Sequence, residues 1–297
     1  MVQIVSPCLL AVCPPADARR IDAMDAPVSW QVPDRSQQAA RQVFEHLRDL
    51  IISLALAPGT ALSRAALQAQ FGLSSTPIRD ALMRLEQEGL VEVFPQSGTI
   101  VSLIDVPLAR QAQFLRRSIE QEAVRVLAAA HDAGLVDRLE AIVGEQRILA
   151  KRGDLEAFNQ ADLAFHKVLY DAAGVPDLWF LVRKRSGHID RIRRLHLPIG
   201  RKASEIISDH AAIVKAIAQR KPAAAQTALR DHLSRSLAFT DELRARFPGY
   251  FKEGSPDPAS PAVTRADGRR RVPTASDRAM TARRSSRRLD RAKRTGL

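Results

Sequence analysis

Four side chains in the second half of the sequence have the types and spacing of a metal site. Asp162 and His166 are four residues apart, so on a helix they share one face, one turn apart. His210 and His232 each fall midway along a later stretch with helical periodicity. If these stretches line one cavity, they offer one carboxylate and three imidazoles, which suits zinc, nickel, iron or copper. On spacing alone, ordinary helical histidines remain the simpler interpretation.

Helices must position those four side chains, because residues 108–247 show helical periodicity and no strand pattern. Glycine and proline punctuate the amphipathic stretches, as they do at helix ends. We therefore expect an all-α helical bundle with antiparallel neighbours. The expected helices span residues 108–130, 135–151, 154–173, 176–196, 201–220 and 222–247.

A helix-turn-helix is the second candidate functional element, and it precedes the helical half. Ser63 can cap a first helix, and Gly72 can end it in the left-handed conformation. Ser74 or Ser75 can cap the second helix, with Pro77 in its first turn, where the missing N–H costs nothing. The start of the second helix is polar and suits base edges and phosphates.

The elements around this pair complete a winged helix. Residues 37–54 have the apolar period of a preceding helix. After Gly89, residues 90–94 predict a strand, 95–98 a turn and 99–103 a return strand. The hairpin would form a wing beside the DNA backbone. The side chains expected to face the core are Ile78, Leu82, Leu85 and Leu90.

Several short motifs in this half resemble the winged-helix domain of GntR-type bacterial transcription regulators. They are Pro58-Gly59-Thr60, Gly72-Leu73-Ser74, the run from Thr76 to Leu82, Arg84-Leu85-Glu86, Glu88-Gly89-Leu90 and Gly98 before Val101. The resemblance implies sequence-specific binding of a palindromic double-stranded DNA operator by a homodimer. The DNA-contacting residues it implies are Arg64, Ser74, Ser75, Thr76, Arg79, Arg84 and Gly98.

Two positions depart from that family pattern. Ser75 and Ser97 stand where the family usually carries arginine. Arginine makes strong contacts to phosphate and guanine, so its absence predicts weaker binding or an altered sequence preference.

The helical half resembles the ligand-binding (FCD) domain of the FadR branch of the same family. The matching motifs are Leu115 to Glu120, Asp162 with Phe165-His166, Asp209-His210 and His232-Leu233. The resemblance implies a divalent metal held by Asp162, His166, His210 and His232, with zinc expected and nickel or manganese as alternatives. Asp209 departs from the usual glutamate, a change that we expect to leave the ligand set intact.

A small carboxylate metabolite is the effector that the resemblance implies. Arg116 matches a family arginine that points into the effector cavity, and a guanidinium binds a carboxylate through two hydrogen bonds. Arg193, Arg194 and Arg201 are further candidates, each of which could equally be a solvated helix residue. The remaining histidines receive no role: His46, His131, His188 and His196.

Length, charge and cysteine content limit the possible domain organisation of this 297-residue chain. We expect an N-terminal extension over 1–35, the winged helix over 36–104, the effector and metal domain over 105–252 and a disordered Arg-rich tail over 253–297. From Gly254 onward the sequence holds eleven Arg and one Lys against four Asp, which accounts for most of the net charge of +12. Global charge is therefore poor evidence for specific DNA binding.

The sequence of the N-terminal extension gives little support for a secretion signal or a membrane-targeting segment. Its two cysteines, Cys8 and Cys13, indicate no disulfide framework and favour a reducing cytoplasm. The short apolar run beside them is too short to span a membrane, and Met24 is an alternative start.

Three functions are compatible with these features. The favoured one is a transcriptional regulator, with repression the commoner mode, whose operator binding responds to a small acid bound near the metal. The second is a metal-dependent enzyme that uses the three-His, one-Asp set. HExxH, a nucleophile elbow and a phosphate-binding glycine loop are all absent from the sequence, so we expect no enzyme. The third is an architectural DNA binder that acts through the Arg-rich tail.

Overall fold

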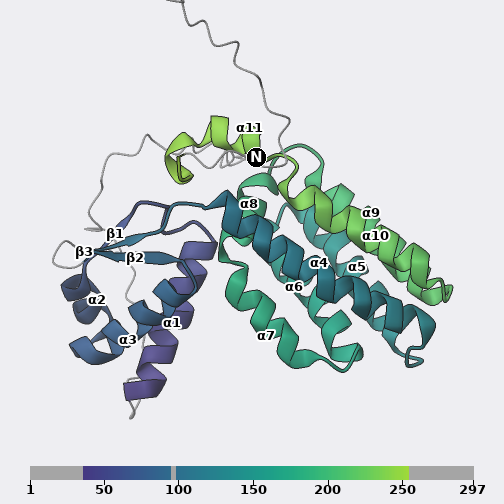
Figure 1. Cartoon of the computed structure of the whole chain (residues 1–297), viewed down its shortest axis with the longest axis horizontal. Helices are drawn as coiled ribbons and strands as arrows, with labels where there is room; N and C mark the ends of the chain where they lie inside the picture. Colours follow the sequence, from purple (N-terminus) through teal and green to yellow (C-terminus); the bar gives the residue numbers. More distant parts are fainter. Residues whose placement is uncertain (1–35, 95–97, 254–297) are drawn as a thin grey trace, which may run out of the picture. The chain divides into compact units, whose positions relative to one another are not determined.

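A computed structural model describes residues 36–94 and 98–253 of the protein (Figure 1). Residues 95–97 of the expected turn at 95–98, the N-terminal extension 1–35 and the tail from residue 254 lie outside the described residues. As expected, the structure is mainly α: a winged helix-turn-helix is followed by a helical domain. In the part that is described, no helix is both long and apolar enough to cross a membrane.

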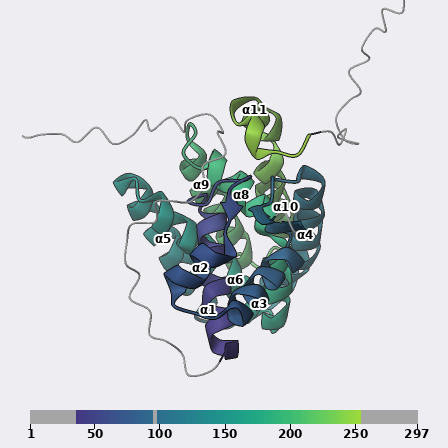
Figure 2. The same ribbon diagram turned by 90° about the vertical axis from the view of Figure 1, so that its left-hand side faces the viewer.

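The winged helix forms around three helices and a small antiparallel sheet (Figures 1 and 2). Helix α1 contributes apolar residues at helical spacing to a core that includes the inner faces of α2 and α3. In the sheet, β3 lies between β1 and β2, with Val91 opposite Val101 and Ala61 opposite Ile100. The elements are α1 (Ser36–Ile52), β1 (Ala61–Leu62), α2 (Arg64–Phe71), α3 (Ser75–Gln87), β2 (Val91–Phe94) and β3 (Gly98–Val101).

Local interactions explain where the two helices of the helix-turn-helix, α2 and α3, begin and end. The Ser63 hydroxyl accepts a hydrogen bond from the backbone N–H of Ala66, and Gly72 ends α2 with a left-handed φ of 63°. Ser74 occupies the cap position of α3, but its side chain makes no capping hydrogen bond and remains exposed. The expected capping by serine is therefore confirmed for α2 only.

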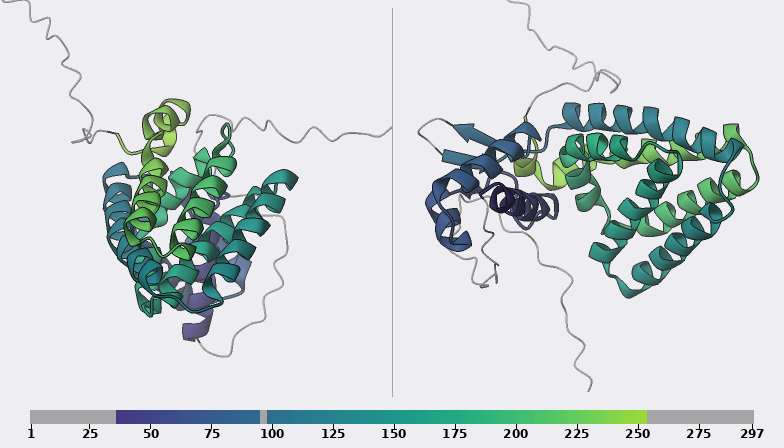
Figure 3. Two further views of the ribbon diagram at one scale, coloured as in Figure 1. Left: turned by 90° about the vertical axis from the view of Figure 1, so that its right-hand side faces the viewer. Right: turned by 90° about the horizontal axis from the view of Figure 1, so that it is seen from below.

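The helical domain packs around an apolar core from α4, α5, α6, α9 and α10 (Figure 3). Asp105 caps α4 by accepting from the backbone N–H of Leu108. The elements are α4 (Val106–Ala129), α5 (Leu135–Arg152), α6 (Leu155–Ala172), α7 (Pro176–Arg185), α8 (Gly187–His196), α9 (Lys202–Ala218), α10 (Pro222–Ser234), η1 (Arg235–Leu237), α11 (Thr240–Arg246) and η2 (Pro248–Tyr250).

Two of the expected helices were wrong in extent. The stretch 176–196 is divided into α7 and α8 at Ser186, next to the point where Gly187 lies against Leu90. In the stretch 222–247, α10 ends at Ser234. The Ser234 hydroxyl donates a hydrogen bond to the backbone oxygen of Arg230 at 2.7 Å. A short 3₁₀ turn and α11 follow, so neither stretch is one continuous helix.

Candidate metal centre and nucleic-acid interface

The structure brings the four expected metal ligands together in the interior of the helical domain. Asp162 and His166 come from α6, His210 from α9 and His232 from α10, and each is at most 5% exposed. One ligand atom from each lies within 4.8 Å of all the others. The Nε2 atom of His232 is 3.3 Å from Nε2 of both His166 and His210.

The opposite nitrogen of each imidazole faces an oxygen acceptor. Nδ1 of His166 lies 2.8 Å from Glu120 Oε2, and Nδ1 of His210 lies 3.0 Å from Gln146 Oε1. Nδ1 of His232 lies 3.3 Å from Asp209 Oδ2. An acceptor at Nδ1 holds the proton there, so all three Nε2 lone pairs point toward one another.

Burial and neighbouring charges place the ligands in the protonation states that a metal requires. Burial alone would raise the pKa of Asp162, but Arg193, His166 and His210 hold it well below its usual range. Burial lowers the pKa of His166 to about 4 and also lowers the pKa values of His210 and His232. The site therefore offers an ionised carboxylate and neutral imidazoles.

The geometry fits a divalent cation. With metal–nitrogen bonds of about 2.0–2.1 Å, tetrahedral ligands lie about 3.3–3.4 Å apart, close to the His232 Nε2 separations of 3.3 Å. Among the described residues, Asp162 Oδ1 is buried without a hydrogen-bond partner, and it lies 3.7 Å from His210 Nε2. A cation would satisfy this oxygen and remove the repulsion among the three lone pairs.

The four effector arginines of the sequence analysis occupy different surroundings. Arg116 is buried near the cluster, and its Nε donates to Glu120 Oε1 at 2.6 Å. Arg194 pairs with Glu156 on α6, and Arg201 is exposed just before α9. The structure thus brings Arg116 and Arg193 close to the metal ligands, and Arg193 donates to Asp162 Oδ2.

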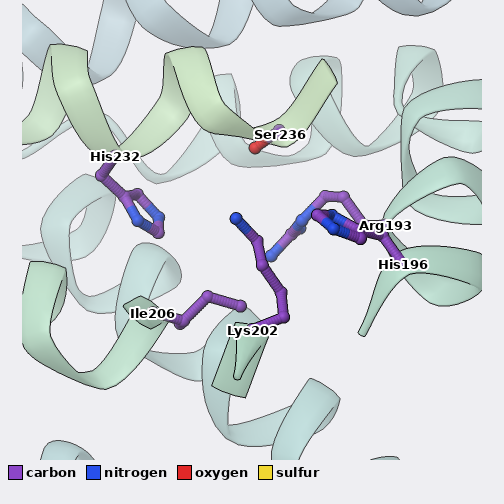
Figure 4. Close-up of a pocket in the computed structure, with 6 residues that line it drawn as sticks. All are labelled: Arg193, His196, Lys202, Ile206, His232 and Ser236. Atoms are coloured by element: carbon purple, nitrogen blue, oxygen red, sulfur yellow. The ribbon is translucent and has the colours of Figure 1, made fainter. Parts of the chain in front are cut away.

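A small cavity adjoins the cluster at His232 (Figure 4). Its polar lining includes Arg193, whose guanidinium also donates to Asp162 Oδ2. Its other lining residues are His196, Lys202, Ile206 and Ser236. Sequence reasoning named Arg193 but missed Lys202, Ser236 and a role for His196, because no spacing pattern relates them to the ligands.

The helix-turn-helix presents a polar face and buries an apolar one. Ile78, Leu82, Leu85 and Leu90 are at most 2% exposed, as expected from their spacing. Arg79 is 63% exposed and has Asp80 at 3.7 Å, so its guanidinium remains accessible. All the expected DNA-contacting residues are exposed: Arg64, Ser74, Ser75, Thr76, Arg79, Arg84 and Gly98.

Fold and site together define a winged-helix DNA-binding protein with a metal-ligand cluster in a helical domain. Residues 39–101 match the family described as bacterial regulatory proteins, gntR family, and residues 112–235 match the FCD domain. An HTH-type transcriptional regulator in an unstable DNA locus of Streptomyces ambofaciens is 38% identical over 71% of this chain and 89% of its own length. The chain therefore belongs to the GntR family of bacterial transcription regulators, with the FadR-like combination of winged helix and FCD domain.

Other relatives agree with this assignment. The HTH-type transcriptional repressor RspR of Escherichia coli K12 is 27% identical, over 73% of this chain and 96% of its own length. In the solved structures, Escherichia coli McbR/YncC has the same fold, with a TM-score of 0.60 at 19% identity over 69% of this chain and 98% of that one. These comparisons indicate a transcriptional regulator and not an enzyme, which settles the choice between the first two functions.

Proposed function

We propose that this protein is a metal-dependent, effector-responsive repressor of the FadR subfamily. It binds a palindromic operator as a homodimer in the cytoplasm, at the nucleoid. A small organic acid binds at a divalent metal in the helical domain and changes operator affinity. The metal is zinc, with nickel or manganese as alternatives. The observation that carries the proposal is the convergence of three Nε2 lone pairs and one ionised carboxylate beside a cationic cavity.

Each set of residues has a separate task in this proposal. Asp162, His166, His210 and His232 hold the metal, which supplies a Lewis acid for a carboxylate oxygen. Arg193 sits beside Asp162 and lines the cavity, so it can donate to the bound acid. Repression as the mode of action is supported by the relative RspR, which is a repressor.

DNA contacts come from the polar start of α3 and from the exposed arginines around it. Arg79 is the main candidate for a base contact, since an arginine fork matches the acceptors of guanine. The palindrome follows from symmetry, because a two-fold dimer presents two equivalent reading helices. The expected non-specific contribution of the Arg-rich tail lies outside the described residues and remains a prediction.

The test uses the full chain, loaded with Zn²⁺, and an operator obtained by selection from random duplexes. We expect Arg79→Ala to weaken operator binding by about 1–3 kcal/mol. Arg152→Ala, an exposed arginine at the end of α5, should bind like the wild type. Fluorescence anisotropy measures both variants, and equal affinity for Arg79→Ala would overturn the assignment of α3.

The same assay tests the effector. Small carboxylates are titrated into the Zn²⁺-loaded complex, and one of them should shift the operator affinity of the wild type. That shift should vanish in His166→Ala, which lacks a metal ligand and should retain no Zn²⁺ after dialysis. If no acid changes operator affinity in the Zn²⁺-loaded wild type, the protein is a regulator whose signal enters elsewhere.

A further inference from the structure

Resting on the proposed function, we propose that residues 240–253 form a strap that sets the half-site spacing which the dimer accepts. The strap comprises α11, η2 and the extended residues after them. It holds the linker 102–105, which joins β3 of the winged helix to α4 of the helical domain. Strap and linker both lie outside the residues that match the two family domains, 39–101 and 112–235.

The first support is a backbone connection between strap and linker. The N–H of Ile104 donates to the backbone oxygen of Tyr250 at 2.7 Å. The N–H of Lys252 donates to the backbone oxygen of Ile104 at 3.0 Å. Ile104 thereby forms a parallel bridge with Phe251, and Ile104 is fully buried. Buried backbone groups need hydrogen-bond partners, so the linker cannot leave the strap without finding others for both groups.

The second support is the apolar packing of Phe251. Its side chain is only 3% exposed and belongs to one buried cluster with Ile104 of the linker and Leu243 of α11. The same cluster includes Ile189 and Ile192 of α8. A buried phenyl group is among the largest apolar contributions that one side chain makes. The strap is thus held to both the linker and α8.

The third support is an ion pair between the strap and the sheet of the winged helix. Lys252 Nζ lies 2.8 Å from Glu92 Oε1 on β2 and 4.0 Å from Asp105 Oδ2 in the linker. The backbone oxygen of the same lysine accepts from Arg244 on α11 at 3.2 Å. Exposed ion pairs add little stability, so the apolar packing retains the strap, and the ion pair orients β2 relative to it.

These contacts bear on operator choice because a dimer reads two half-sites at once. The distance between the two copies of α3 depends on where each winged helix lies relative to its helical domain. Each added base pair moves a half-site by about 3.4 Å and turns it by roughly 35° around the duplex. A linker held by the strap at Ile104 has little freedom to follow such a change, whereas a released linker can act as a hinge.

The first experiment needs no DNA. Hydrogen exchange of backbone amides, measured by mass spectrometry in the full, Zn²⁺-loaded chain, compares the wild type with Phe251→Ala. We expect exchange in the linker to become about tenfold faster or more, because removal of a buried phenyl group favours local opening. Exchange in α5, which contributes no residue to the cluster, should stay unchanged. Phe251→Leu keeps an apolar side chain and should restore most of the protection.

The second experiment measures the spacing preference. The selected operator is rebuilt with one or two base pairs added or removed between its half-sites, and fluorescence anisotropy gives the affinity of each duplex. The wild type should bind the best spacing about tenfold or more tightly than its neighbours, because only that spacing lets both copies of α3 bind. We expect this preference to fall several-fold in Phe251→Ala and in Lys252→Glu.

Lys252→Glu is the second variant because its effect does not depend on removing a buried group. It replaces the ion pair with repulsion from Glu92 and Asp105. Exchanging the two charges, in Glu92→Lys combined with Lys252→Glu, should recover the preference. The matched control is Lys151→Glu, which changes an exposed lysine at the end of α5 and should keep the preference.

The outcomes separate this inference from the proposed function. Unchanged linker exchange in a folded Phe251→Ala overturns the strap, and if that variant does not fold, an unchanged spacing preference in Lys252→Glu overturns it. If the wild type binds a palindrome and every strap variant keeps its spacing preference, the proposed function stands and this inference alone fails. If the wild type binds no palindromic duplex, the proposed function fails and the spacing role fails with it, while the exchange measurement still decides whether the strap holds the linker.

Discussion

At the scale of single residues, the metal cluster depends on the groups behind the ligands. Glu120 is fully buried and accepts hydrogen bonds from Arg116, His166 and the Tyr170 hydroxyl. Burial alone would raise its pKa, but Arg116 and His166 lower the pKa of Glu120 to about 2. An ionised Glu120 fixes the orientation of the His166 ring, and thereby of its Nε2 lone pair.

Glu120→Gln tests this dependence. The amide keeps the shape of the side chain, but its nitrogen is a donor and cannot accept from His166 or Arg116. We expect Zn²⁺ affinity to fall about 10–100-fold, measured by competition with a chelating dye. Glu122→Gln, an exposed glutamate on the same helix, should leave the affinity unchanged. Unchanged affinity in Glu120→Gln would show that helix packing alone orients His166.

The ligands could be predicted from the sequence, whereas most of the groups that orient them could not. Asp162 and His166 are related by one helical turn, and the family motifs include His210 and His232. Gln146 meets His210 across 64 residues, and His166 meets Glu120 across 46. Such contacts depend on how the helices pack, which periodicity does not determine. The same holds for Lys202 and Ser236.

At the scale of elements, the division of residues 176–196 into α7 and α8 is the clearest departure from the periodic pattern. A Cβ at Gly187 would lie 2.5 Å from Leu90 Cδ2 and 3.8 Å from Ile52 Cδ1. The start of α8 thus packs against the winged helix at a point where only glycine fits without displacement. Periodicity missed the division because the apolar residues on either side of it, Val182 and Ile189, keep the seven-residue spacing of one helix face.

Gly187→Ala should therefore destabilise the protein. Overpacking a closely packed site typically costs about 1–3 kcal/mol, and Leu90 is fully buried and has little room to move. Gly144→Ala is the control: it lies within α5 with nothing within 4 Å of its added Cβ. Alanine there should stabilise the helix by up to about 1 kcal/mol. Urea unfolding at fixed protein and Zn²⁺ concentrations measures both, and similar stabilities would contradict the packing argument.

At the scale of the whole molecule, α8 contacts both functional regions. Arg193 on this helix donates to the metal ligand Asp162. Arg191, two residues earlier, is fully buried and donates to the backbone oxygen of Ser102 at 2.6 Å and to the Ser102 hydroxyl at 3.2 Å. Ser102 directly follows β3 of the winged helix. A ligand that moves Arg193 therefore acts on the helix that holds the end of β3.

Arg191→Met tests whether this helix carries the effector signal. Burial lowers the pKa of Arg191 to about 10, and the backbone oxygens of Ser102 and Gly187 accept from its guanidinium. Methionine fills similar volume without these hydrogen bonds. We expect operator and acid each to bind the variant, while the effect of the acid on operator affinity declines several-fold. Allosteric couplings of about 1–3 kcal/mol make such a decline measurable.

Arg48→Met is the matched control for that variant. Arg48 on α1 donates to the backbone oxygen of Arg183 on α7 at 2.9 Å, so it joins the same two domains without involving α8. Its loss should leave the coupling unchanged. Because coupling is reciprocal, operator DNA must weaken acid binding by the same factor as the acid weakens operator binding, and titrations in both directions give two measurements of one free energy. If Arg191→Met melts normally and keeps the full coupling, the signal does not pass through α8.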